Sequence, residues 1–215
     1  MSPRGGRALV VAGGDPPRPE DLAGEAPWEW VIAADSGLDH AYGLGLEVDV
    51  VVGDLDSVSP GALDRARRRG ATIQQHPRDK DATDLELALD AALALDAAGL
   101  LVVGVGGGRP DHALANLLLM AGPAYAEVDV DARTREGRFV VVRSRPRSFR
   151  GAPGDLLTLL PLHGSARRVR AEGLRWRLDD DDLPAGSTRG VSNELTHSTA
   201  WVVVGDGVVL AVQPR

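Results

Sequence analysis

The chain contains no cysteine, which excludes disulfide bonds, thiolate metal sites and cysteine nucleophiles. No apolar run approaches the roughly 18 residues that a membrane-spanning helix needs. The basic N-terminus precedes an apolar run that is too short for a signal peptide. With 215 residues, of which 43% are hydrophobic and 26% charged, the composition is that of an ordered globular protein. We therefore expect a cytoplasmic protein with no membrane partner.

Lysine is almost absent, because Lys80 is the only lysine among the 24 basic residues. The formal net charge is −7, and a field of that sign repels polyanions, which argues against a nucleic-acid partner. A small anion remains compatible with this charge where a metal ion mediates its binding. A lone lysine among arginines suits a site that needs a compact ammonium group, although chance survival explains it equally well.

Short β-rich runs alternate with helical stretches over the first 125 or so residues. The runs are 8–12, 28–35, 48–54, 72–76 and 100–105. Their unbroken apolar stretches are typical of strands buried on both faces of a parallel sheet. Helices are expected over 60–69 after an N-cap at Ser59, from Thr83 to a stop at Gly99, and over 112–121. This alternation predicts a doubly wound α/β domain with a mainly parallel sheet.

The pattern changes after about residue 126, where only short β-like runs remain. They are 139–142, 155–162, 166–171, 174–178, 199–205 and 208–213. The acidic run Asp179–Asp182 is expected to be a solvated loop between strands. We predict a smaller antiparallel β domain, a sandwich or a barrel, and domains over 1–134 and 135–215. Residues 126–133 fit the last strand of the first domain.

Aspartates follow the predicted strands of the first domain. They are Asp35, Asp54, Asp56, Asp81, Asp84 and Asp111. Because the carboxyl ends of parallel strands share one edge of a sheet, we expect these acids to gather in one crevice. Crowded carboxylates repel one another unless a cation lies between them, and oxygen-only ligation favours Mg²⁺, Mn²⁺ or Ca²⁺. The sequence therefore predicts a phosphate-bearing ligand that enters as its metal complex.

Each of these residues also has a structural explanation. Aspartates after strands are common turn residues, Thr83 and Asp111 fit helix N-caps, and a lone histidine such as His112 is usually structural. Other nucleotide motifs fit poorly. The chain contains no GxxxxGK[ST] sequence, and Arg109 occupies the third glycine position of a GxGxxG pattern over 104–109. A P-loop NTPase is thereby excluded, and a dehydrogenase is disfavoured.

Five motifs in order resemble the thiamine pyrophosphokinase family. They are Ala34–Gly37, Gly53–Ser57, Lys80–Asp84, Gly107–His112 with Asn116, and Gly190–Glu194. Each motif alone is weak, but their order and spacing extend over about residues 8 to 213. The resemblance implies an α/β catalytic domain that binds ATP and Mg²⁺, followed by a β-sandwich domain for thiamine binding and dimerisation.

The resemblance also implies the reaction and the residues that carry it. The expected enzyme is a homodimer that transfers the terminal diphosphoryl group of ATP to the hydroxyl of thiamine, which yields thiamine diphosphate and AMP. Residues that match metal-binding or catalytic acids are Asp35, Asp54, Asp56 and Asp84. Residues that match contacts to ATP or to the reacting groups are Lys80, Thr83, Arg109, Asp111, His112 and Asn116. Ser192 and Asn193 match thiamine contacts, and the general base is left open between Asp84 and Asp111.

Two features depart from the family pattern. Ser36 stands where many members have glycine, so its backbone conformation must suit a side chain. The last predicted strand has no aromatic residue to place against thiamine, and Trp176 or Trp201 is a substitute candidate because an indole face attracts a thiazolium cation. Two other functions stay open, namely the same chemistry on another alcohol such as a hydroxymethylpterin, and a non-catalytic nucleotide-binding module.

Overall fold

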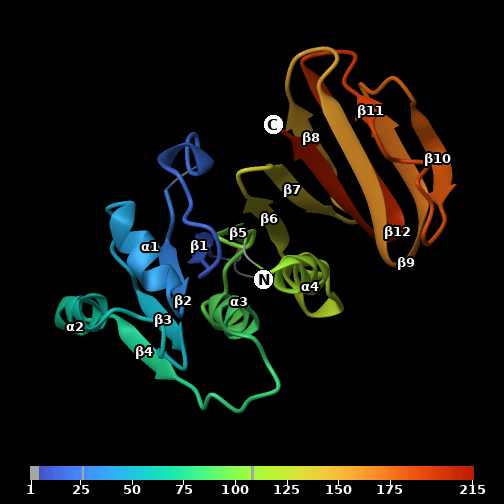
Figure 1. Cartoon of the computed structure of the whole chain (residues 1–215). Helices are drawn as coiled ribbons and strands as arrows, with labels where there is room; N and C mark the ends of the chain where they lie inside the picture. Colours follow the sequence, from blue (N-terminus) through green and yellow to red (C-terminus); the bar gives the residue numbers. More distant parts are fainter. Residues whose placement is uncertain (1–4, 26, 108) are drawn as a thin grey trace. The chain divides into compact units, whose positions relative to one another are not determined.

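The computed structural model describes residues 5–25, 27–107 and 109–215 and divides into two compact units (Figure 1). The first comprises Met1–Leu119 and Val128–Arg135, and the second comprises Met120–Glu127 and Glu136–Arg215. The first unit contains a parallel sheet with helices, and the second contains antiparallel strands. The predicted fold class is thereby confirmed. Within the described ranges, no helix combines the length and apolarity needed to cross a bilayer.

Six parallel strands form the sheet of the first unit. They are β1 (Arg7–Val11), β2 (Trp30–Ala34), β3 (Val50–Gly53), β4 (Thr72–Gln75), β5 (Gly99–Val103) and β6 (Asp129–Arg133). Their order is β4-β3-β2-β1-β5-β6. All five predicted strands and the proposed sixth are confirmed. Because the chain moves outward from β1 to β4 and returns to the other side of β1 as β5, the order reverses between β1 and β5.

Helices cover both faces of this sheet. The helices of the chain are α1 (Gly37–Gly43), α2 (Pro60–Arg69), α3 (Asp84–Ala94) and α4 (Pro110–Met120), with the short 3₁₀ turn η1 (Pro19–Asp21). A second 3₁₀ turn, η2 (Pro123–Tyr125), belongs to the second unit. Side chains of α1 and α2 share a buried cluster with the alternate residues Leu9 and Val11 of β1. No residue of α3 belongs to that cluster, yet α3 packs against β1, β2 and β3, so it covers the opposite face.

The ends of the helices follow the expected capping chemistry in part. Asp111 is not the N-cap of α4, because that helix already begins at Pro110. Ser59 and Thr83 are confirmed as N-caps, because their hydroxyls accept the backbone N–H of Ala62 at 3.3 Å and of Glu86 at 3.2 Å. The predicted stop of α3 near Gly99 is wrong. The helix ends at Ala94 and Gly99 already begins β5. The seven-residue helix α1, with glycine at both of its ends, was not predicted.

Two long strands organise the second unit. Its elements are β7 (Gly137–Val142), β8 (Arg147–Arg150), β9 (Leu156–Glu172), β10 (Leu178–Leu183), β11 (Asn193–Glu194) and β12 (Thr199–Pro214). β12 pairs with β9 over most of its length, with β8 near its start and with β7 near its end. β10 and β11 pair with different parts of β9. Each long strand therefore has different partners along its length, around a core that includes Phe149, Leu157 and Leu183.

The structure corrects three expectations for this unit. The run 174–178 is not a strand, since Leu174 forms only an isolated bridge with Leu195 and Leu178 already begins β10. The runs 155–162 and 166–171, and likewise 199–205 and 208–213, are not separate strands but the halves of β9 and β12. Gly207, with φ +88°, forms a bulge where the register shifts, so the chain bends without leaving the sheet. The acidic run Asp179–Asp182 is not a loop but part of β10, an edge strand in which Asp180 pairs with Arg170 of β9 at 3.2 Å.

Candidate active site

A cavity of about 600 Å³ opens at the carboxyl ends of the parallel strands, where the strand order reverses. Its walls come from the segments that follow β1, β2, β4 and β5, from Ser57 after β3, from the first turn of α3 and from the first two turns of α4. The volume lies in the range that suits a small-molecule substrate or cofactor. The sheet topology thus gathers, in one pocket, side chains that are far apart in the sequence.

Three aspartates at the ends of β2 and β3 form the densest acidic cluster. Asp35 directly follows β2, and Asp54 and Asp56 follow β3. One carboxylate oxygen of each lies within 4.8 Å of the other two. The backbone N–H of Asp35 donates to Val52 of β3 at 2.8 Å, which holds the two strand ends together. This spacing is compatible with three oxygen ligands around one divalent cation.

Asp35 is electrostatically strained in the absence of a cation. Burial raises the pKa of its carboxyl, and the nearby carboxylates of Asp84, Asp54 and Asp56 raise it further, against a hydrogen bond from the Ser36 backbone. Its Oδ1 atom is buried and has no hydrogen-bond partner among the described residues. An unpaired buried carboxylate oxygen is costly, so this atom is suited to a ligand that supplies positive charge.

Strained backbone positions surround the same cluster. Asp35 has φ +46° and Leu55 has φ +66°, a region that side chains rarely occupy outside functional sites and tight turns. Gly53 has φ +145°, and a Cβ added there would lie 3.1 Å from Asp84 Oδ1 and 3.2 Å from Asp35 Cβ. Ser36 adopts an ordinary helical conformation at φ −58°, so its departure from the family glycine introduces no strain.

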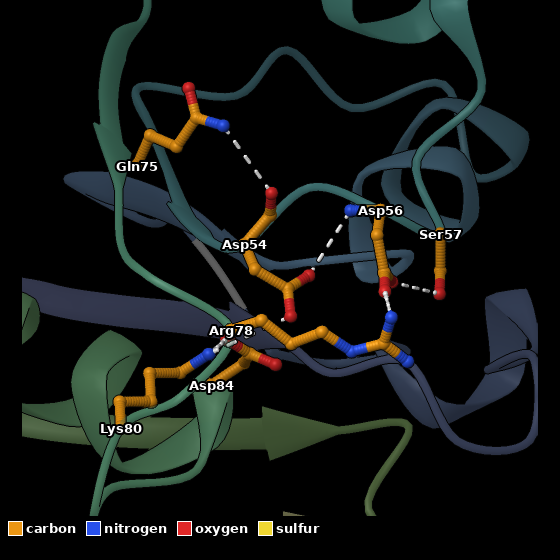
Figure 2. A network of polar contacts seen from close by, with 7 residues as sticks. All are labelled: Asp54, Asp56, Ser57, Gln75, Arg78, Lys80 and Asp84. Atoms are coloured by element: carbon orange, nitrogen blue, oxygen red, sulfur yellow. Dashed lines mark hydrogen bonds and ion pairs between the residues drawn. The ribbon is translucent and has the colours of Figure 1, made fainter.

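Lys80 provides positive charge beside the acids (Figure 2). Its ammonium nitrogen lies 3.1 Å from Asp84 Oδ1 and 3.9 Å from Asp54 Oδ2, and its side chain is only 15% exposed. Around this pair, the Asp54 carboxylate accepts the backbone N–H of Asp56 at 3.1 Å, and Arg78 lies 3.7 Å from Asp56. The only lysine of the chain is therefore placed at the acidic cluster and in the cavity wall.

Two glycine-rich turns form the other side of the cavity. The turn after β1 is bonded to the turn after β5, because Gly14 donates to the Gly104 carbonyl and Asp15 to the Gly106 carbonyl, both at 2.8 Å. A Cβ on Gly14 would lie 2.4 Å from the Gly104 oxygen, so only glycine permits this approach. The turn after β1 was not among the predicted site segments. The rule that ligands bind at strand ends would have found it.

Residues at the start of α4 adopt separate roles. Arg109 lines the cavity, but its guanidinium donates to both oxygens of Asp111, at 3.2 and 2.5 Å. That pairing lowers the pKa of Asp111 to about 2, and Asp111 is exposed and does not line the cavity. His112 and Asn116 do line it, and the amide of Asn116 donates to the Val105 carbonyl at 3.2 Å. Gly108 lies outside the described residues.

The remaining predicted residues of the first unit are placed as follows. Thr83 caps α3 and also lines the cavity beside Asp84. Asp54 and Asp56 border the cavity through their contacts with Lys80 and Arg78 rather than forming its wall. Asp81 is exposed and does not line the cavity.

Ser192 and Asn193 belong to the second unit, where Asn193 is buried. Its side-chain oxygen accepts the backbone N–H of Trp176 at 3.0 Å, and its amide donates to the Trp176 carbonyl at 2.8 Å. Ser192 has φ +58°, and its backbone N–H donates to Thr158 Oγ1 at 3.0 Å. Trp176 is 53% exposed with the Arg175 guanidinium 4.9 Å from its ring centre, whereas Trp201 is partly buried on β12. Of the two indoles, Trp176 is the more accessible.

Comparison with known proteins identifies both units. Residues 26–130 match the family model described as thiamin pyrophosphokinase, catalytic domain, and residues 146–209 match thiamin pyrophosphokinase, vitamin B1 binding domain. The chain is 24% identical over 213 residues to the thiamine pyrophosphokinase of Bacillus subtilis (strain 168), covering 95% of this chain and 96% of that protein. It is 23% identical over 178 residues to thiamine pyrophosphokinase 1 of Oryza sativa subsp. japonica, covering 78% and 66% of the two chains.

Solved structures show the same fold. The crystal structure of thiamine pyrophosphokinase from Bacillus subtilis superposes with a TM-score of 0.81 at 23% identity and covers 97% of this chain and 99% of that one. A thiamin pyrophosphokinase family protein from Enterococcus faecalis gives a TM-score of 0.78 at 26% identity, with coverage of 97% and 99%. Since two models of one family match successive parts of the sequence and the fold agrees over nearly its whole length, the chain belongs to the thiamin pyrophosphokinase family.

Proposed function

We propose that this protein is a thiamine pyrophosphokinase, which transfers the terminal diphosphoryl group of ATP to the hydroxyl of thiamine and releases thiamine diphosphate and AMP. The observation that carries the proposal is the cluster of Asp35, Asp54 and Asp56 with Lys80 at the edge of a 600 Å³ cavity. Such a site suits a polyphosphate that arrives with a divalent cation. Family membership supports ATP and thiamine as the substrates.

The residues present fit Mg²⁺. All three clustered ligands are carboxylate oxygens within 4.8 Å of one another, and one buried oxygen of Asp35 lacks a partner among the described residues. Asp35, Asp54 and Asp56 would hold the ion, with Asp84 adjacent. When bound, Mg²⁺ neutralises charge on the phosphates and makes the β-phosphorus more open to attack.

The chain's own residues orient the reactants and balance charge. The Lys80 ammonium is held between Asp84 and Asp54, where it can contact a phosphate oxygen that enters the cavity. Thr83, Arg109, His112 and Asn116 line the same cavity and are proposed as contacts to ATP. Fixed charges and donors that need no reorganisation during the reaction lower its barrier.

The proton of the thiamine hydroxyl requires an acceptor. Asp84 lines the cavity, whereas the carboxylate of Asp111 is engaged by Arg109 and has its pKa lowered to about 2 by that hydrogen bond. A carboxylate with so low a pKa is a weak base. Asp84 is therefore the better supported base, and Asp111 would act by holding Arg109.

The second unit is proposed to bind thiamine, which the vitamin B1 binding domain match over residues 146–209 supports. Ser192 and Asn193 stay predictions as thiamine contacts. The side-chain oxygen and the side-chain NH₂ of Asn193 already form hydrogen bonds with the Trp176 backbone. Asn193 would therefore act by fixing the position of that indole. We also propose a homodimer that works in the cytoplasm, to be checked by light scattering on the purified chain and by cell fractionation.

One assay tests the proposed function. The purified chain is incubated with ATP and Mg²⁺, together with thiamine, with a hydroxymethylpterin or with no acceptor, and AMP is measured. We expect AMP only with thiamine. AMP formation only with the pterin would show that the acceptor is another alcohol. Nucleotide binding without AMP formation under any condition would indicate a non-catalytic module.

A further inference from the structure

Asp15 is a cavity-lining carboxylate that the proposed reaction does not use. It ends the glycine-rich turn after β1, and its backbone N–H donates to the Gly106 carbonyl at 2.8 Å. That hydrogen bond fixes the residue against the turn that follows β5. Asp15 therefore has a defined position at the point where the strand order of the sheet reverses.

The Asp15 carboxylate has no hydrogen-bond or ion-pair partner among the described residues. Its carboxylate lies directly against Gly107, where an added Cβ would come within 2.0 Å of Asp15 Cγ. In the part of the chain that the structure describes, no hydrogen bond or ion pair engages this carboxylate. Asp54 and Asp84 contact Lys80, and Asp111 is bound by Arg109, whereas Asp35 belongs to the acidic cluster that is proposed to hold the divalent cation. A lone acceptor in a cavity wall is suited to hydrogen-bond donors of a ligand.

The position of Asp15 separates it from the phosphate end of the cavity. The acidic cluster and Lys80 belong to the ends of β2 and β3 and the segment before α3, whereas Asp15 belongs to the β1 and β5 turns. A carboxylate without a cation repels a phosphate group and attracts neutral donors. If the triphosphate occupies the end with Lys80, the β1 and β5 turns are left for the nucleoside.

We infer that Asp15 accepts hydrogen bonds from the 2′- and 3′-hydroxyls of the nucleotide ribose and thereby makes the protein select ribonucleotides over deoxyribonucleotides. The vicinal hydroxyls offer two neighbouring donors to the two carboxylate oxygens. The amino group of adenine, in contrast, is flanked by ring nitrogens that would repel a carboxylate. This inference rests on the proposed function only in taking ATP as the ligand.

The test is nucleotide binding by calorimetry, with the full chain, Mg²⁺ and no thiamine. ATP, 2′-deoxy-ATP and 3′-deoxy-ATP are compared for the wild type, Asp15→Ala and Asp15→Asn. A hydrogen bond to a charged group makes a difference of about tenfold to hundredfold in affinity. We expect the wild type to bind ATP at least about tenfold more tightly than either deoxynucleotide. Asp15→Ala should weaken ATP binding to the level of the deoxynucleotides and leave their affinity nearly unchanged.

Matched controls separate this effect from general damage. Asp64→Ala removes an exposed carboxylate on α2 outside the cavity and should retain the wild-type preference. Asp15→Asn keeps the size of the side chain and one acceptor oxygen, so it should give an intermediate preference. Melting temperatures of both Asp15 variants should match the wild type, because the side chain makes no hydrogen bond or ion pair in the described part of the chain.

Several results would overturn the inference. One is a wild type that binds ATP and both deoxynucleotides alike, and another is an Asp15→Ala variant that keeps the wild-type preference. A wild-type preference for GTP that Asp15→Ala abolishes would show that the residue reads a base edge instead. AMP formation from thiamine without ribose selection would refute this inference alone. Ribose selection without AMP formation would refute the proposed function alone, and absence of nucleotide binding would refute both.

Discussion

Replacement of Asp35 by asparagine should stabilise the metal-free protein while removing its response to Mg²⁺. Asp35 carries a buried oxygen without a partner, and its carboxylate lies within 4.8 Å of those of Asp54 and Asp56. At that separation two like charges repel by about 1 to 3 kcal/mol for effective dielectric constants between those of water and of a protein surface. Lys80 offsets part of this repulsion, which leaves an expected gain of about 1–2 kcal/mol.

The asparagine side chain should fit without strain. It has nearly the same shape as aspartate, its remaining oxygen can still accept the hydrogen bond from the Ser36 backbone, and asparagine tolerates positive φ values such as the +46° found here. For a chain of this size, the gain corresponds to a rise in melting temperature of about 2–8 °C in EDTA.

Thermal unfolding in EDTA and in Mg²⁺ measures the effect, with Asp64→Asn on the exposed surface of α2 as the control. The wild type should be stabilised by Mg²⁺ and Asp35→Asn should not. The gap between the two proteins in EDTA should narrow as the pH falls, because protonation of a carboxyl whose pKa is raised by burial and by neighbouring acids removes the same charge. A lower melting temperature for Asp35→Asn in EDTA, or an undiminished Mg²⁺ effect, would refute this reasoning.

Three further changes test the scaffold of the site by chemical unfolding. Gly37→Ala should destabilise the protein by about 1–3 kcal/mol or more, because an added Cβ would lie 2.0 Å from the Val11 carbonyl oxygen. Gly61→Ala on α2 is the control and should be neutral or stabilising, since a Cβ there meets no atom within 4 Å. Glu25→Gln should cost about 1–2 kcal/mol at pH 7. Burial raises the pKa of Glu25, but hydrogen bonds from two arginines lower it by more, so its pKa lies below the ordinary value of 4.5. The stabilisation that the Glu25 carboxylate provides is therefore complete above pH 4.5 and is lost as the pH falls through the lowered pKa. Asn193→Ala should cost about 1–3 kcal/mol, because it leaves the backbone N–H and carbonyl of Trp176 without their partner. An unchanged denaturation midpoint for any of the three destabilising variants would contradict the packing or hydrogen bonding described.

Much of the first unit could be predicted because two simple regularities govern it. Buried parallel strands have continuous apolar runs, and ligands bind at the carboxyl ends of such strands. The second regularity brought together Asp35 and Asp54 correctly. It applied equally to Asp15 after β1, which was not among the aspartates predicted for the site. Helix α1 was missed because its seven residues show too few turns for a helical period to emerge.

The second unit was harder to predict because its long strands depend on tertiary pairing. Glycine at 164 and 207 and the short polar stretches between apolar runs are typical of turns, but here they form bends and a bulge inside β9 and β12. The four aspartates of β10 have low strand propensity, and their pairing with the arginine-rich part of β9 outweighs it. No local pattern in the sequence reveals that Asn193 binds the backbone of Trp176, because that contact joins residues 17 positions apart.

The proposed function requires that the aspartates after β2 and β3 bind a divalent cation shared with the phosphates of ATP. AMP production from ATP, Mg²⁺ and thiamine by Asp54→Asn, compared with the wild type, tests it most directly. The variant keeps the oxygen that accepts the Asp56 backbone N–H and should therefore stay folded, as judged by its melting temperature. We expect AMP production to fall to background in the folded variant, and near wild-type AMP production by Asp54→Asn would refute the metal-binding role of these aspartates.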